Sequence, residues 1–206
     1  MSSEDDSKAP GRPRDPSLDG RILQAAREVY TRYGWSGFTV KAVAATAGAS
    51  RDAVGRRFGT REELLMEALT ASGFPLLEQH DGQPLREWLL ELTLAIVDVF
   101  TRGPGRAYLR IHLDADHVPG LFAAYRRRVL EPGQQMLREH IAEAAREQNI
   151  DDIDPSTVTE DILGPTVLLA LLNQDIGGDR NRLADLRAHL SAVVDRALSR
   201  HGSIII

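Results

Sequence analysis

Residues 39–63 limit the fold of this chain more than any other segment. The segment, TVKAVAATAGASRDAVGRRFGTREE, contains two short stretches of helix-forming residues. Two short helices that cross closely need a small residue at the crossing, a glycine in the turn and an aliphatic residue that packs inward. Ala44, Gly48 and Val54 occupy these places. The spacing predicts a helix-turn-helix, the motif whose second helix enters the major groove of DNA.

Hydroxyl side chains stand where three successive helices should begin. Thr39, Ser50 and Thr60 can each accept a hydrogen bond from an N–H group of the first turn. Glu63 follows Thr60 at the spacing of a capping box. We therefore expect a recognition helix over residues 51–57 and a third helix after Thr60. For this pattern alone, an alanine-rich helix pair without a DNA-binding role is the alternative interpretation.

Residues 21–69 as a whole resemble the DNA-binding domain of the TetR (tetracycline-repressor) family of bacterial transcription regulators. Residues 21–26 resemble its opening helix, residues 33–40 its Gly-aromatic turn, and residues 58–65 its Phe-x-Ser-Lys-Glu-Glu-Leu exit. The family usually has a tyrosine three residues before the exit phenylalanine. This chain has Gly55 there, so that tyrosine's contact with the DNA backbone does not carry over. The resemblance implies a homodimeric DNA-binding regulator, most often a repressor, on a palindromic operator.

The side chains expected to face double-stranded DNA lie on and around the recognition helix. Arginine there can bond guanine edges or hold phosphate, while flanking residues position the backbone. The chain carries a net charge of −5, yet residues 20–60 contain seven Lys/Arg against two Asp/Glu. A basic head on an acidic body is expected when phosphate neutralisation is local. The expected DNA-binding residues are Thr39, Val40, Lys41, Ser50, Arg51, Asp52, Ala53, Arg56, Arg57 and Arg61.

Composition and periodicity predict an all-α protein. Of the 206 residues 42% are hydrophobic and none is cysteine, which excludes disulfides and thiolate metal sites. No stretch approaches the roughly 18 apolar residues of a membrane span, so we expect a cytoplasmic, nucleoid-associated protein with no membrane partner and no cofactor. About nine helices are expected. Among them are helices near 18–33, from residue 85, over 106–113, over 121–148 with a kink at Pro132, over 158–172 with a bend at Pro165, and from residue 183.

The chain divides into three expected parts. Residues 1–16 are polar and aperiodic, which predicts a disordered arm. Its Gly11-Arg12-Pro13-Arg14 stretch lies in a DNA minor groove or is an idle tail. Residues 17–72 form the predicted helix-turn-helix domain. Residues 73–206 form a dimerisation and effector-binding body.

The last two helices contain more apolar residues than the remaining body can cover. Pairing with a second copy in a four-helix bundle would bury the excess, and the resemblance implies the same arrangement. A monomer in which these helices complete the core is the alternative. The expected interface residues are Val167, Leu171, Leu186, Leu190, Val193, Val194 and Ala197.

The resemblance also implies a small effector that fills a pocket and changes the separation of the two DNA-binding heads. An apolar lining with few polar groups is usual in small-molecule sites. Each such residue could equally fill the core. The expected lining is Trp88, Leu92, Ile96, Phe100, Tyr108, His112, Phe122, Tyr125 and Leu168.

Metal and catalytic motifs are weak. His112, Asp114, Asp116 and His117 cluster, but two histidine ligands on one helix face need a separation of three or four residues and these are five apart. No P-loop, Gly-x-Ser-x-Gly or Gly-x-Gly-x-x-Gly motif occurs. We therefore expect no enzyme, no catalytic residue and no metal. Two alternatives stay open, an all-helical metal enzyme centred on His112 and His117, and an effector-independent DNA-binding protein.

Overall fold

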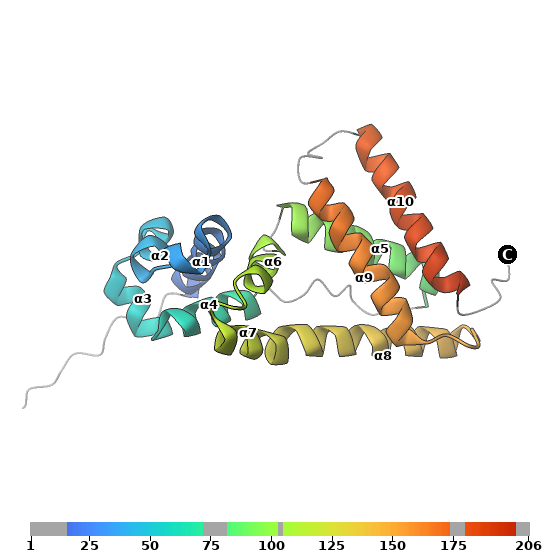
Figure 1. Ribbon diagram of the computed structural model, residues 1–206, viewed down its shortest axis with the longest axis horizontal. Coiled ribbons are helices and arrows are strands. Elements are labelled where there is room, and N and C mark those ends of the chain that lie inside the picture. Colours follow the sequence, from blue (N-terminus) through green and yellow to red (C-terminus); the bar gives the residue numbers. More distant parts are fainter. Residues whose placement is uncertain (1–15, 72–81, 103–104, 174–179, 201–206) are drawn as a thin grey trace, which may run out of the picture.

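The computed structural model describes residues 16–71, 82–102, 105–173 and 180–200. Every regular element in these ranges is helical, which confirms the predicted all-α class (Figure 1). Since α7, the π-helical turn η1 and α8 form one continuous helix, the described residues hold the nine helices expected. The elements are α1 Pro16–Gly37, α2 Val40–Ala47, α3 Arg51–Phe58, α4 Arg61–Thr70, α5 Leu85–Arg102, α6 Gly105–Leu113, α7 Pro119–Tyr125, η1 Arg126–Leu130, α8 Glu131–Glu147, α9 Pro155–Leu172 and α10 Arg180–Ser199.

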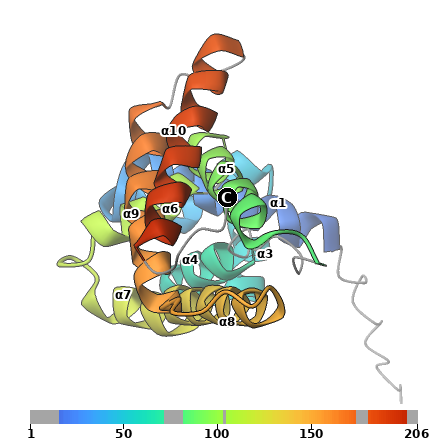
Figure 2. The same ribbon diagram turned by 90° about the vertical axis from the view of Figure 1, so that its right-hand side faces the viewer.

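The helices gather at two ends of an elongated molecule. Helices α1–α4 form a head, α5, α8, α9 and α10 form most of a body, and α6 and α7 lie between them (Figure 1). Helix α5 packs against α9 and α10 and places its apolar stripe in the core. The view at 90° shows α9 and α10 side by side, with α8 running below them (Figure 2).

Pro132 lies inside a continuous helix that runs from Pro119 to Glu147. Proline lacks an N–H and its ring collides with the carbonyl four residues earlier. The helix widens by one residue just before it, because the N–H of Glu131 donates to the carbonyl of Arg126, five residues back. This π-helical turn accommodates the proline. The predicted helix over 121–148 is therefore present, starts two residues earlier, and contains a π turn where the sequence led us to expect a kink.

Helix α9 begins three residues before the predicted start. The carboxylate of Asp154 accepts the N–H groups of Ser156 and Thr157, and Pro155 takes the first helical position, where its missing N–H costs nothing. Pro165 is contained within the helix.

Several expectations concern residues outside the described ranges. The predicted arm falls there except for Pro16, as does the predicted domain boundary near residue 72. Within the described ranges, no helix combines the length and the apolar character that a membrane crossing requires.

Candidate nucleic-acid interface

The turn between α2 and α3 has the geometry that the sequence predicts. Gly48 is left-handed, with φ 63° and ψ 38°, a conformation that glycine adopts at little cost. The Thr39 hydroxyl accepts the N–H of Ala42 at 3.1 Å, and the Ser50 hydroxyl accepts the N–H of Ala53 at 3.1 Å. Both short helices therefore begin at capped ends.

Helix α3 turns one aliphatic side chain inward and several polar ones outward. Val54 is buried in the core of the head, whereas Arg51, Asp52 and Arg56 are exposed. Helices α2 and α3 lie at the outer end of the head (Figure 1). Of the other expected DNA-binding residues, Thr39, Lys41 and Ser50 are exposed, and Val40 and Ala53 are half-buried.

Arg57 is not the free groove-facing side chain that the sequence suggested. Its Nε lies 2.6 Å from Oδ1 of Asp19 in the first turn of α1, and its Nη1 donates to the Ala53 carbonyl at 3.2 Å. The Arg57 side chain is only 16% exposed. The ion pair ties the C-terminal end of the recognition helix to α1. Because 38 residues separate the partners, no local pattern could have shown this role of Asp19.

Arg61 lies over an aromatic ring beside the recognition helix. Its guanidinium carbon is 3.8 Å from the centroid of the Trp35 ring, and its Nη1 donates to the Phe38 carbonyl at 3.5 Å. A cation over an indole face is attracted by the ring quadrupole. These two contacts hold Arg61 near the expected DNA surface. The sequence marked Trp35 only as part of a turn, and its ring contacts the Arg61 guanidinium.

Both ends of α4 are capped by side chains. At its start, Thr60 and Glu63 form the predicted capping box, with the Thr60 N–H donating to Glu63 Oε2 at 2.8 Å. This bond, assisted by the Thr60 hydroxyl, lowers the pKa of Glu63. At its end, the Ala68 carbonyl accepts from Arg27 at 2.8 Å and the Leu69 carbonyl accepts from the Tyr108 hydroxyl at 3.0 Å. The second of these bonds joins the head to α6.

The histidine and aspartate cluster at the end of α6 has side chains that contact other groups or are exposed. His112 Nδ1 is 2.8 Å from the Tyr108 carbonyl oxygen, and the Asp114 carboxylate accepts the N–H of Trp35. Asp116 and His117 are exposed. Among the described residues, no three His, Cys, Asp or Glu side chains are grouped to hold a metal ion. The metal-enzyme alternative therefore has no ligand set in this part of the chain.

Of the nine residues expected at an effector pocket, Tyr125 lines the small hollow that is described below. Leu168 is a correction, because it is 56% exposed on α9. His112 is exposed as well, and Phe122 is half-buried. The others, Trp88, Leu92, Ile96, Phe100, Tyr108 and Tyr125, are buried in the core.

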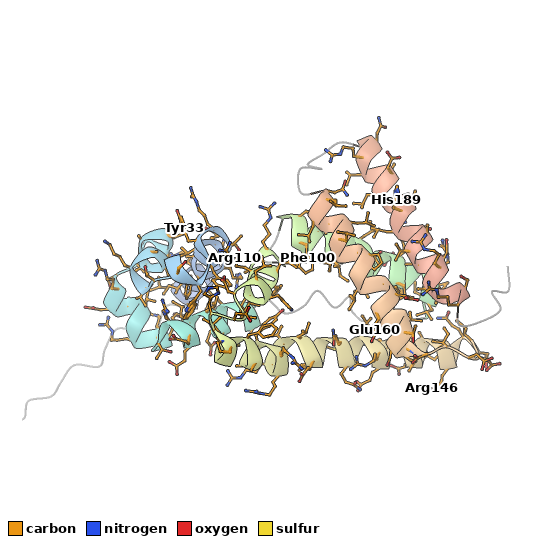
Figure 3. All side chains as sticks on the ribbon, in the orientation of Figure 1. Tyr33, Phe100, Arg110, Arg146, Glu160 and His189 are labelled. Atoms are coloured by element: carbon orange, nitrogen blue, oxygen red, sulfur yellow. The ribbon has the colours of Figure 1, made fainter. Side chains whose placement is uncertain are left out.

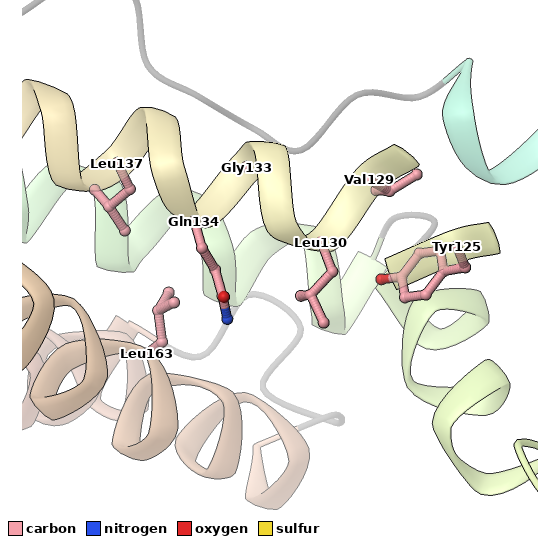
Figure 4. Close-up of a pocket in the computed structure, with 7 residues that line it drawn as sticks. All are labelled: Tyr125, Val129, Leu130, Gly133, Gln134, Leu137 and Leu163. Atoms are coloured by element: carbon pink, nitrogen blue, oxygen red, sulfur yellow. The ribbon is translucent and has the colours of Figure 1, made fainter. Parts of the chain in front are cut away.

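A small hollow does lie beside the π-helical turn, and Tyr125 belongs to it. Leu163 of α9 closes the side opposite α8 (Figure 4). Its cavity volume is about 30 Å³, an order of magnitude below the roughly 300 Å³ of small-molecule sites. The sequence did not indicate this position, because a π turn has no local signature comparable to a cap. The lining is Tyr125, Val129, Leu130, Gly133, Gln134, Leu137 and Leu163.

The residues expected at a dimer interface fall into two groups. Those on α10 are buried within the chain itself, so this part of the expectation is corrected. On α9, Leu171 is 38% exposed and Val167 is half-buried, and the neighbouring Leu168 and Leu172 are exposed. The uncovered apolar surface therefore lies on the C-terminal half of α9. The buried α10 residues are Leu186, Leu190, Val193, Val194 and Ala197.

Comparisons with known proteins agree with this geometry. Residues 22–68 match the model of the family described as bacterial regulatory proteins, tetR family. A putative TetR-family transcriptional regulator from Mesorhizobium loti is 20% identical, with a TM-score of 0.69 over 93% of this chain and 100% of that one. The fatty acid degradation regulator FadR from Bacillus halodurans is 17% identical, with a TM-score of 0.68 over 92% and 100%.

A third solved structure, the flavonoid-responsive regulator FrrA, is 17% identical, with a TM-score of 0.63 over 92% of this chain and 100% of that one. At these identities the likeness establishes the fold. No curated protein matches the chain.

Proposed function

We propose that this chain, whose residues 22–68 match the model of the TetR family, is a homodimeric repressor of that family that binds a palindromic operator and is released by a small, mostly apolar effector. The observation that carries the proposal is the capped recognition helix, with Val54 buried and Arg51 and Arg56 exposed. Exposed arginines on such a helix can bond guanine edges or phosphates. A protein that binds an operator is located on the chromosome, in the bacterial cytoplasm. We propose no catalytic activity.

The exposed leucines of α9 support the homodimer. From Ile162 to Leu172 this helix has one polar side chain, Thr166, and Thr166 is buried. Leu168, Leu171 and Leu172 therefore present apolar surface to solvent, as interfaces between subunits commonly do. Two heads related by a two-fold axis bind the two half-sites of a palindrome.

The effector is supported by the π-turn hollow and by the relatives. Two of the similar structures are a fatty acid degradation regulator and a flavonoid-responsive regulator, and both names suggest largely apolar compounds with polar groups. The Tyr125 hydroxyl and the Gln134 amide are the polar groups among otherwise apolar lining residues. A ligand as large as a fatty acid or a flavonoid requires the hollow to widen. The hollow lies beside a π turn, and π turns often lie at functional sites.

The effector-independent regulator remains a second candidate, and the small cavity volume favours it. Screening compounds for a rise in melting temperature together with a loss of operator binding distinguishes the two. A coupling free energy of ~1 to 3 kcal/mol changes operator affinity by about 5- to 150-fold. Leu163→Trp, which would fill the hollow, should abolish the response to a compound without loss of operator affinity. If no compound changes operator binding, the effector-independent candidate stands.

DNA binding is tested by selecting duplexes from random DNA with the purified protein. The expected result is an enriched palindrome bound in a salt-dependent way. Failure to enrich any sequence would contradict the proposal.

Dimerisation is tested on the same protein by sedimentation. Replacing Leu168 and Leu171 together by glutamate should yield a monomer with weakened operator binding. Met136→Glu is the control, because Met136 is also 38% exposed but belongs to another helix, α8. Retention of the dimer in the Leu168 and Leu171 variant would place the interface elsewhere.

A further inference from the structure

We infer that Asp114 is a positioning residue for DNA binding: it holds the Gly34–Trp35 corner of the head and thereby keeps Arg61 beside the recognition helix. The inference rests on the proposed DNA-binding function. It extends that function to a residue of the body, at the junction with the head.

The carboxylate of Asp114 bridges the body and the head. The Trp35 N–H donates to its Oδ2 at 3.0 Å, although 79 residues separate the two in sequence. The Asp114 side chain is only 14% exposed, and Arg110 Nε lies 3.5 Å from the same oxygen. A hydrogen bond to an ionised acceptor in a shielded place is stronger than a neutral one. Asp114 directly follows α6, so this bond fixes the end of that helix to the head.

The head supplies a fitted site for this carboxylate. Gly34 interrupts the helical geometry of α1 with φ 62° and ψ −169°, and a Cβ there would collide with the guanidinium of Arg110. Burial, together with the nearby charge of Asp114, raises the pKa of Tyr30, so its hydroxyl stays protonated beside the carboxylate. Figure 3 shows Arg110 at the junction between head and body. Asp114 thus contacts backbone that only a glycine-containing corner can present.

The same corner supports the DNA side of the head. The Trp35 ring that follows the bonded N–H carries the guanidinium of Arg61 at 3.8 Å and stacks on Phe38 at 6.0 Å between centroids. Phe38 directly precedes Thr39, the cap of α2, and its carbonyl accepts from Arg61. A shift of the corner therefore moves Arg61, a residue expected to position the DNA backbone.

The test measures affinity for the duplex enriched by the wild-type protein. Asp114→Ala should weaken binding roughly tenfold, the factor that corresponds to 1.4 kcal/mol. Asp114→Asn keeps an oxygen acceptor for the Trp35 N–H and should restore most of the affinity. Asp116→Ala is the matched control, because Asp116 is an exposed aspartate in the same turn and its loss should change nothing.

A double-mutant cycle with Arg61→Ala separates positioning from a general loss of stability. If Asp114 acts through Arg61, the two substitutions together should weaken binding no more than the stronger one alone. In a phosphate ethylation interference assay, ethylation of one particular phosphate should weaken binding of the wild-type protein. Ethylation of that same phosphate should no longer weaken binding of either single variant. Additive effects, or interference changes at different phosphates, would overturn the inference.

Circular dichroism checks that each variant is folded. If Asp114→Ala loses its helical signal, Asp114→Leu, of similar side-chain size, replaces it in the cycle. A wild-type protein that enriches no duplex would refute the proposed function. Wild-type binding with equal affinity in a folded Asp114→Ala or Asp114→Leu variant would overturn the positioning role alone.

Discussion

Replacing Gly55 by alanine tests whether the recognition helix needs bare backbone at its centre. Gly55 lies within α3, and a Cβ built there would meet no atom within 4 Å. Without a steric cost, Gly→Ala in an exposed helix stabilises by about 1 kcal/mol, because alanine loses less backbone entropy on folding. For a chain of this size that is about 2–4 °C in melting temperature. Because the methyl group projects from the expected DNA surface, operator affinity should fall while stability rises.

Thermal unfolding and fluorescence anisotropy with the enriched duplex measure the two effects on the same samples. Gly20→Ala in α1 is the control, because its Cβ also meets nothing within 4 Å and should bring a similar gain in stability with unchanged affinity. Gly55→Tyr introduces the side chain usual in the family, and its larger volume should abolish binding. Tighter binding of Gly55→Tyr to every sequence, or unchanged affinity of Gly55→Ala, would refute the close-approach argument.

Three further substitutions in the head have predicted outcomes. Arg51→Ala should weaken operator binding by ~1 to 3 kcal/mol and relax base preference if Arg51 bonds a base. Arg57→Ala breaks the bond to Asp19 and should weaken binding to the operator and to a random duplex alike. Titrations of each variant with both duplexes distinguish the two effects. The Thr60 bonds lower the pKa of Glu63, so its contribution to stability is complete above the unfolded-state pKa and disappears as pH falls through the lower folded-state pKa. Glu63→Gln should remove this part of the pH dependence of the free energy of unfolding, which urea unfolding measures at several pH values. The same pH dependence in the variant and the wild type would count against the capping role of Glu63.

The sequence predicted the head in detail because its signals are local. Caps at Thr39, Ser50 and Thr60 and the left-handed turn at Gly48 depend on residues within a few positions of one another, and all four are present in the structure. Helix periodicity likewise predicted the elements of the body. The observed ends differ from the predicted ones where a cap or a proline, such as Asp154 or Pro119, sets the boundary.

The contacts between distant segments could not be predicted in this way. A charged residue such as Arg57 has the same sequence signal whether it faces DNA or bonds Asp19. An apolar stripe such as that of α10 indicates burial without saying whether its own chain or a second copy covers it. In α10 the covering surface is the chain itself, whereas Leu168 on α9 remains exposed. The pairing of Asp114 with Trp35 depends on the same kind of long-range contact.

Tyr108→Phe tests how much the junction of α4 and α6 contributes to folding. Tyr108 is buried, and its hydroxyl donates to the Leu69 carbonyl. That carbonyl lies in the last turn of α4, where carbonyls lack a partner within the helix. Phenylalanine keeps the ring and its stacking on Tyr125 but leaves the buried carbonyl without its donor, which typically costs about 1–3 kcal/mol. The free energy of unfolding in urea should fall by that amount.

Tyr33→Phe is the control for the loss of a hydroxyl, because Tyr33 is half-exposed on α1. Its free energy of unfolding should stay within roughly 0.5 kcal/mol of wild type, as for most surface substitutions. Since the Tyr108 bond joins head and body, its loss should also make the α4 amides exchange faster with solvent than those of α2. Equal stability of Tyr108→Phe and wild type would mean that water replaces the hydroxyl at Leu69, and the junction would then depend on apolar packing and on Asp114.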